Sequence, residues 1–161
     1  MQRRDDYSDA IRLRSTRPDD LPTLFDMQTD PQGNVMAGTK PRTREAFFAA
    51  WERHITDPGV HSRVIEIDGE IVGSVARFQA DGQDRVGYWI ARRHWGRGIA
   101  SRDLMAFLGE ERRRPLYATP ASSNAPSRRI LEKCGFRCVG LRMGEETERF
   151  VAREIADYVL E

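Results

Sequence analysis

Hydrophobic and polar residues alternate with a period of two over much of the first half of the chain. The alternation begins at residues 11–14 and returns in three consecutive segments, 62–67, 70–78 and 84–90. This pattern predicts strands that bury one face. Asp-Gly pairs separate the three segments, and Asp-Gly favours the two-residue turns of β-hairpins. We therefore expect an antiparallel meander of three strands after an initial strand.

Four other segments carry apolar residues at offsets of three and four, which predicts amphipathic helices. The first runs from an N-cap at Thr16 to about Thr29, and the second starts at an N-cap at Thr43. The third covers residues 99–112, and the fourth lies between the N-cap Asn124 and Gly135.

The segment from Asn34 to Pro41 has no clear period, although it is unusually apolar for a solvated loop. We expect a loop here. Two interpretations stay open: a connector packed on the core, or a wall of a substrate cleft, since loops commonly carry specificity.

After the third helix, residues 116–119 predict a short strand, parallel to 84–90 because a helical crossover connects the two. Further strands are expected at 137–141 and 150–160. The predicted fold is a mixed α/β domain: a mainly antiparallel sheet of about six to seven strands flanked by about four helices, with one βαβ unit. We expect residues 1–9 to be a flexible N-terminus and residues 10–161 to form a single domain.

Size, charge and hydropathy disfavour several classes of protein. The chain has 161 residues, enough for a core of ordinary size without metals or disulfides. Lys and Arg number 26 against 25 Asp and Glu, and the resulting net charge of +1 disfavours general nucleic-acid binding. No apolar run approaches the roughly 20 residues that span a bilayer, and the N-terminus is charged rather than a signal sequence. We expect a soluble, cytoplasmic protein that binds neither nucleic acid nor membrane.

The two cysteines, Cys134 and Cys138, have no His or Cys cluster beside them. We expect free, mostly buried thiols rather than a zinc site or a disulfide framework. His54 and His61 also lack companions at metal-ligand spacing, so no metal site is predicted.

A glycine-rich turn, Trp95-Gly96-Arg97-Gly98-Ile99-Ala100, joins the strand at 84–90 to the third helix. Glycines at such a junction let the backbone approach a ligand closely, and the first amides of a helix form a positive cradle that suits a phosphate. The turn also lies at the carboxyl end of the first strand of the βαβ unit, where ligands bind in open α/β sheets. We therefore regard it as a candidate anion site.

Three stretches together resemble the GCN5-related N-acetyltransferases (GNAT), and within them the RimJ and RimL branch. They are the run Gly87-Tyr88-Trp89-Ile90, the glycine turn, and residues 124–136 with their Asn, Ser, Glu-Lys and Gly-Phe in place. The resemblance covers roughly residues 11–160, with its specific part at 86–136. A Rossmann dinucleotide domain is a rival for a glycine turn, but its GxGxxG motif is absent and three antiparallel strands precede the turn.

The resemblance implies that acetyl-CoA is the cosubstrate. Backbone amides of Trp95 to Ala100 would bind the pyrophosphate, and the preceding strand would pair with the pantetheine arm. Ile90 would offer a backbone amide to the oxyanion, and Asn124 would contact the pantetheine. Ser127 would lie near the sulfur. The coenzyme phosphates would pair with arginine at Arg97, Arg128 or Arg129.

The chain also departs from the family pattern. Trp95 stands where the general pattern has Arg or Gln, although the RimJ and RimL branch commonly has this Trp. Many relatives carry a tyrosine as general acid at the position of Leu131, so Ser127 or a water would have to serve. Arg85 replaces a glutamate frequent in the branch as general base. The carboxylates that could reach the cleft instead are Glu66, Asp84, Glu145 and Glu148.

The predicted function is acetyl transfer from acetyl-CoA to a primary amine of a small molecule or peptide, by direct attack in a ternary complex. Neither cysteine lies where a covalent intermediate would need a nucleophile. The alternatives are a catalytically silent acyl-CoA-binding or regulatory domain, and a nucleotide-binding module. Exposed edges of the last strands would allow a homodimer.

Overall fold

One seven-stranded sheet, in the order β1-β2-β3-β4-β5-β7-β6, runs through residues 11–161, which the computed structural model describes. The expected flexible segment at 1–9 lies outside these residues. All neighbouring strands are antiparallel except β4 and β5, which confirms the predicted mixed sheet. The strands are β1 (Ile11–Ser15), β2 (His61–Ile67), β3 (Glu70–Ala80), β4 (Gln83–Ile90), β5 (Leu116–Ala118), β6 (Arg137–Gly144) and β7 (Arg153–Leu160).

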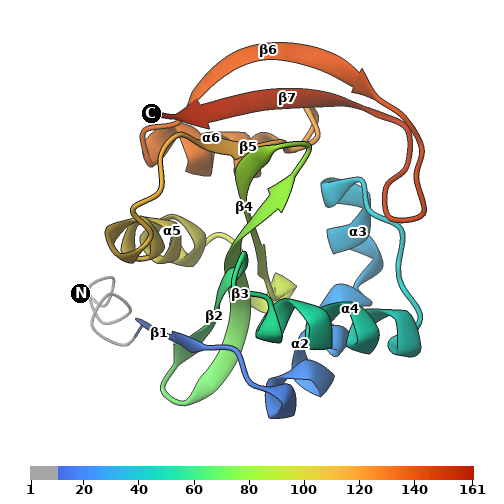
Figure 1. Cartoon of the computed structure of the whole chain (residues 1–161), viewed down its shortest axis with the longest axis vertical. Helices are drawn as coiled ribbons and strands as arrows, with labels where there is room; N and C mark the ends of the chain where they lie inside the picture. The colour runs from blue at the N-terminus through green and yellow to red at the C-terminus, as the bar shows by residue number, and fades with distance from the viewer. Residues whose placement is uncertain (1–10) are drawn as a thin grey trace.

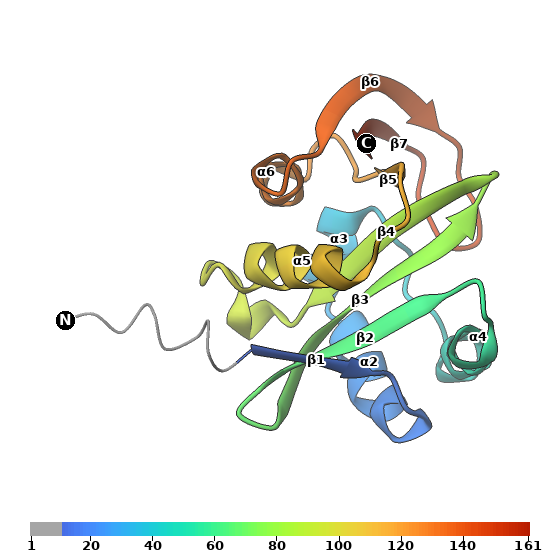
Figure 2. The same cartoon turned by 60° about the vertical axis from the view of Figure 1, so that its left-hand side comes forward.

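Helices cover both faces of the sheet (Figures 1 and 2). Side chains alternate along the strands, so Val64 joins the buried cluster under α2 and α4, while its neighbour Ile65 joins the larger cluster under α5 and α6. The helical elements are η1 (Pro18–Asp20), α2 (Leu21–Gln28), α3 (Pro31–Ala37), α4 (Arg44–Thr56), η2 (Arg92–His94), α5 (Ile99–Glu110) and α6 (Ala125–Lys133).

The two Asp-Gly pairs make the tight turns that the sequence predicts. Both residues of each pair have positive φ, at 51° and 82° in Asp68-Gly69 and at 51° and 75° in Asp81-Gly82. This is the geometry that matches the twist of a hairpin. Strands β2, β3 and β4 therefore follow one another as the expected meander.

The loop expected from Asn34 to Pro41 is wrong over Asn34 to Ala37, because residues 31–37 form helix α3, and it is confirmed only from Gly38 onward. Asp30 caps this helix by accepting a hydrogen bond from the amide of Gln32, and Pro31 takes the first helical position. The segment Asp30-Pro31 therefore follows the end of α2 and also starts α3. Gly33 lets α3 approach the sheet closely, since a Cβ there would come within 2.8 Å of the Trp89 ring.

Three smaller expectations are also wrong. Thr16 does not cap the first helix: its hydroxyl bonds the Ser62 hydroxyl, and the Asp20 carboxylate accepts from the Arg17 amide instead. The last strand starts at Arg153 rather than Phe150, because Phe150 pairs with Thr39 in an isolated bridge. Both cysteines are free as expected, but Cys138 is exposed on the edge strand β6 rather than buried.

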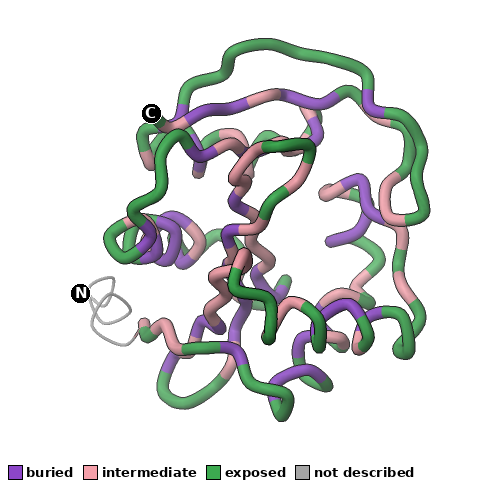
Figure 3. The backbone as a smooth tube through the Cα atoms, in the orientation of Figure 1, coloured by how far each residue is buried: buried purple, intermediate pink, exposed green. Residues whose placement is uncertain are grey.

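Strand β6 forms one edge of the sheet, opposite β1, and is exposed over nearly its whole length (Figure 3). Its exposed residues include the apolar Val139, Leu141 and Met143. An edge of this kind is able to pair with a second chain. The homodimer expected from the sequence stays a prediction.

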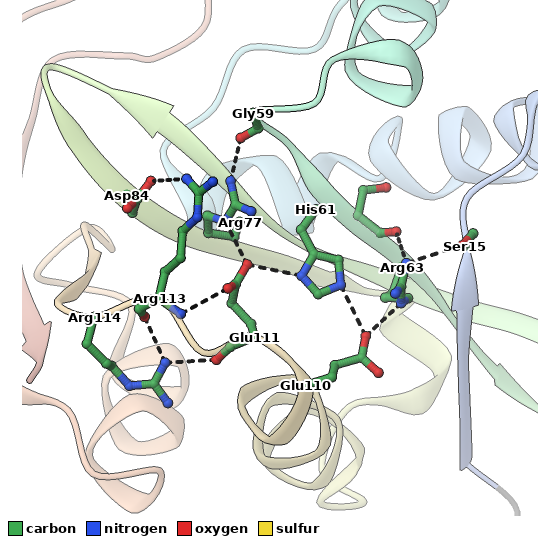
Figure 4. A network of polar contacts seen from close by, with 11 residues as sticks. Ser15, Gly59, His61, Arg63, Arg77, Asp84, Glu110, Glu111, Arg113 and Arg114 are labelled. Carbon is green, nitrogen blue, oxygen red and sulfur yellow. Dashed lines mark hydrogen bonds and ion pairs between the residues drawn. The ribbon is translucent and has the colours of Figure 1, made fainter.

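Helix α5 is fixed at its C-terminal end by a polar network that reaches β2 and β3 (Figure 4). Glu111, which directly follows α5, is only 4% exposed. One of its carboxylate oxygens accepts from Arg77 Nε at 2.6 Å and lies 3.0 Å from His61 Nδ1. The other accepts from the Arg113 amide at 3.1 Å. Buried charges are stable only when paired in this manner.

These contacts determine the charge of Glu111. Burial alone would raise the pKa of its carboxyl, but the hydrogen bonds from Arg77, the Arg113 amide and His61 outweigh burial and lower the pKa to about 2. The unfolded chain releases this proton near the ordinary value of 4.5. Glu111 therefore contributes stability that is complete above that value and is lost as the pH falls toward 2.

The substitution Glu111→Gln should lower the free energy of unfolding at pH 7 by about 3 kcal/mol, because it leaves the Arg77 guanidinium buried without a counter-charge. Urea denaturation at pH 7 and pH 3 measures this effect. The difference in the free energy of unfolding between the variant and the wild type should be smaller at pH 3, because the charged Glu111 carboxylate stabilises the fold less at that pH.

The control is Glu110→Gln, which removes a half-exposed carboxylate from the same network. It should cost less than about 1 kcal/mol. Equal losses for the two variants would mean that the buried pair does not anchor the helix.

Candidate coenzyme site

Strands β4 and β5 diverge immediately after they meet. They pair only at Arg85 and Tyr117, near the start of β4. A cavity of about 600 Å³ opens beside the diverging part of β4. It is lined by residues of α3, β4, η2, the glycine turn, α5 and α6: Gly33, Met36, Ala37, Tyr88, Trp89, Ile90, His94, Trp95, Gly96, Gly98, Ile99, Ala100, Ser101, Asn124, Pro126, Ser127, Arg129, Ile130 and Lys133.

The edge of β4 that faces this cavity carries backbone groups without a strand partner. The Ala91 amide donates to Val72 in β3 at 2.9 Å. Because successive peptide groups of a strand point to opposite sides, the amides of Ile90 and Tyr88 face away from β3, toward the gap. An extended ligand could therefore pair with β4 as a strand would.

Two glycines of the turn have positive φ, a backbone conformation that residues with a Cβ rarely adopt. Gly96 and Gly98 have φ of 78° and 75°, and Gly98 is the N-cap of α5. A Cβ at either position would meet no atom within 4 Å, and both glycines line the cavity. The Trp95 indole donates to the carbonyl oxygen of Ile90 at 2.8 Å. This bond links the turn to the end of β4.

Helix α6 contributes polar side chains from the opposite wall. Asn124 caps it, since its Oδ1 accepts from the Ser127 amide at 3.2 Å. The Ser127 hydroxyl oxygen lies 2.8 Å from the Tyr88 hydroxyl oxygen. Burial raises the pKa of Tyr88 to about 12 although its bond to Ser127 lowers it, so the phenol is neutral at ordinary pH.

Of the three candidate arginines, one lines the cavity and two do not. Arg129 lines the cavity, one helical turn from Lys133, which lines it too. Arg97 is exposed and does not line it. Arg128 instead donates to the Tyr158 hydroxyl and to the Ser122 carbonyl, which ties α6 to β7.

Of the other predicted binding residues, Ile90, Trp95, Gly96, Gly98, Ile99, Ala100, Asn124 and Ser127 all line the one cavity. The four candidate carboxylates do not line it. Glu66 pairs with Arg14 at 2.9 Å, and Asp84 pairs with Arg113. Glu145 and Glu148 are exposed in the connection between β6 and β7. Among the lining residues listed above there is no Asp or Glu.

Several parts of the lining have no binding role in the prediction from the sequence. The sequence predicts a loop where α3 lies, although Met36 and Ala37 belong to the segment for which a wall of a cleft is one of the two interpretations. Tyr88 belongs to the strand motif at residues 87–90, but its hydrogen-bond partner Ser127 is 39 residues away in the sequence. The sequence gives His94 no predicted role, and Lys133 enters only as part of the Glu-Lys pair of the family resemblance. The spacing of Lys133, four residues after Arg129, was the available signal.

Burial and nearby Arg93 lower the pKa of His94, so its imidazole is neutral at pH 7. In residues 11–161, no group of three or more His, Cys, Asp and Glu side chains is placed to hold a metal ion. The same residues include no helix with the length and hydropathy to cross a membrane.

The chain is similar to known proteins in sequence and in fold. The model of the acetyltransferase (GNAT) domain family matches residues 10–137. YdaF of Bacillus subtilis (strain 168), named as a ribosomal N-acetyltransferase, is 31% identical over 100 residues, which are 58% of this chain and 55% of YdaF. The chain thus spans about half the length of this relative.

Two solved structures have the same fold. Spermidine N-acetyltransferase from Vibrio cholerae, with CoA and spermine, has a TM-score of 0.82 at 17% identity, over 94% of this chain and 95% of that chain. RimL, a ribosomal L7/L12 alpha-N-protein acetyltransferase in complex with coenzyme A, has a TM-score of 0.79 at 16% identity, over 96% and 95%. The predicted resemblance to the GNAT family is confirmed by the family model, and the RimJ and RimL branch stays a prediction. The chain belongs to the acetyltransferase (GNAT) domain family.

Proposed function

We propose that the protein transfers an acetyl group from acetyl-CoA to a primary amine by direct attack in a ternary complex. The observation that carries this proposal is the meeting of three features in one cavity: the unpaired edge of β4, the glycine turn at the start of α5, and the polar face of α6. Each suits a different part of acetyl-CoA.

The donor would lie along β4. Its pantetheine arm would pair with the outward amides of Tyr88 and Ile90 in the manner of an added strand. Its pyrophosphate would accept hydrogen bonds from the turn from Gly96 to Ala100. Arg129 and Lys133 would pair with the remaining phosphate charge. Asn124 would donate its side-chain amide to the pantetheine, since its Oδ1 is occupied by the Ser127 amide.

The chemistry follows from this placement. A neutral amine attacks the thioester carbonyl carbon, a C–N bond forms, and the carbonyl electron pair moves to the oxygen, which the Ile90 amide stabilises. The C–S bond then breaks and sulfur leaves with the electron pair. The nitrogen loses one proton and the sulfur gains one, so the products are an N-acetyl amide and CoA.

Within residues 11–161, no Asp or Glu lines the cavity and could receive the proton of the acceptor amine. None of Glu66, Asp84, Glu145 and Glu148 lines the cavity. We therefore assign its removal to water, before attack. An amine is mostly protonated at neutral pH, so the fraction that is neutral limits the rate.

The acceptor would approach from the side of α3, whose Gly33, Met36 and Ala37 form an apolar wall. The Vibrio cholerae relative is solved with spermine, and RimL is named for a ribosomal protein. Both ligands present amines. A small-molecule or peptide amine is thus the proposed acceptor class.

The missing carboxylate also favours a second candidate, a catalytically silent acyl-CoA-binding domain. Turnover of acetyl-CoA with a panel of polyamines, amino acids and peptide N-termini distinguishes the two. Release of free thiol together with an N-acetyl product supports the enzyme, whereas CoA binding without transfer to any amine supports the silent domain.

Replacing Gly96 and Gly98 together by Ala should weaken CoA binding by about tenfold or more. Alanine disfavours positive φ, so the turn would move its amides away from the ligand, and the added Cβ atoms would occupy the open side. Isothermal titration calorimetry with CoA measures the change.

The matched control is Gly69→Ala with Gly82→Ala. These glycines have φ of 82° and 75° and equally open surroundings, but they lie in the β-hairpin turns. The control carries the same conformational strain and should keep its CoA affinity. Equal loss in both double variants would show that general destabilisation, not the cradle, explains the effect.

The proposed use of water predicts how the rate depends on pH. The value of kcat/KM should rise with pH along the titration of the acceptor's own amine, and its midpoint should move when acceptors of different amine pKa are compared. Steady-state kinetics between pH 6 and pH 10 with two such acceptors tests this. A midpoint that stays the same for both acceptors would point to a base on the enzyme.

A further inference from the structure

The cavity contains three hydroxyl-bearing side chains among the described residues, those of Tyr88, Ser101 and Ser127. Ser101 already donates to the Gly98 carbonyl at 3.2 Å. Tyr88 and Ser127 come from different elements, β4 and α6, and their oxygens lie 2.8 Å apart. They are therefore a bonded pair that spans the two walls of the cavity.

The environment of Tyr88 favours this residue as the donor of the hydrogen bond to Ser127. Its ring packs against the larger buried cluster. Burial and the nearby Cys134 and Asp103 raise the pKa of its hydroxyl, so it keeps its proton throughout the physiological range. A phenol has a single proton to donate. The shortest contact available to that proton is Ser127 Oγ, while the Ser127 carbonyl lies farther away at 3.3 Å.

A serine hydroxyl that accepts from Tyr88 must direct its own proton elsewhere. The Ser127 amide is already bonded to Asn124, which fixes the start of α6 and holds the side chain in place. Both residues line the cavity, so the Ser127 proton is able to point into it. The pair thus presents one aligned O–H donor to a ligand there.

We propose that Tyr88 is a positioning residue, which orients the Ser127 hydroxyl so that it donates to the sulfur of acetyl-CoA. This inference rests on the proposed function. Leu131, at 1% exposure, has no proton to give, so this chain would stabilise the leaving sulfur through β4 and α6 together. As the C–S bond breaks and sulfur takes the electron pair, the Ser127 hydrogen bond stabilises the thiolate. Tyr88 keeps its proton throughout.

The variant Tyr88→Phe removes the hydroxyl and keeps the ring in the core. It should lower kcat by about three- to tenfold, the value of one neutral hydrogen bond, with CoA affinity unchanged within about twofold. Ser127→Ala should lower kcat at least as much. The double variant should be no slower than Ser127→Ala, because Tyr88 acts only through Ser127.

A second measurement needs no turnover. The pKa of the thiol of bound CoA, followed by the ultraviolet absorbance of the thiolate, should be higher in Tyr88→Phe than in the wild type, since a donor to the thiolate lowers the thiol pKa. The control is Tyr117→Phe, which removes a half-buried hydroxyl on β5 outside the cavity and should change neither quantity.

The outcomes separate the two proposals. An unchanged thiol pKa in Tyr88→Phe, or losses that multiply in the double variant, would overturn the positioning role even if the wild type is an active acetyltransferase. A shifted thiol pKa in a protein that acetylates no amine would support the positioning role and contradict the proposed function alone.

Discussion

The divergence of β4 from β5 is the constraint on which the site depends. A parallel pair that continued would have satisfied the outward amides of Tyr88 and Ile90 and closed the cavity. Because pairing ends at Arg85 and Tyr117, the middle of the sheet keeps an open edge, and backbone groups there need another partner. The same gap lets α6 face β4 across the cavity, which brings Ser127 to Tyr88.

The C-terminal end of helix α5 contributes to the stability of the fold, and its N-terminal end forms part of the candidate coenzyme site. Its C-terminal end is fixed to β2 and β3 through the buried pair of Glu111 and Arg77. Its N-terminal end carries Gly98 in the left-handed conformation, and Gly98, Ile99 and Ala100 all line the cavity. A helix anchored at one end presents its other end at a defined place. The polar network therefore supports the cradle without contacting a ligand.

Much of this arrangement follows from local sequence patterns. Asp-Gly turns, alternating strands and the caps at Thr43 and Asn124 are short-range signals, and they predicted the meander, α4 and α6. The sequence does not predict helix α3, because its seven residues include Gly33 and show no helical period. The helix packs against the ring of Trp89, which lies in a strand far away in the sequence. Tyr88 was visible as a strand residue, but its role depends on Ser127, which only the tertiary fold brings near. The sequence also does not show that the four candidate carboxylates lie outside the cavity, because their positions depend on the tertiary fold.

The central claim is that the free edge of β4 binds the coenzyme as an added strand would. Residue-resolved hydrogen exchange of the backbone amides, measured by NMR with and without CoA, tests it most directly. The account predicts that exchange of the Tyr88 and Ile90 amides slows when CoA binds, together with that of Ile99 and Ala100 at the start of α5. Unchanged exchange at Tyr88 and Ile90 in a protein saturated with CoA would contradict it.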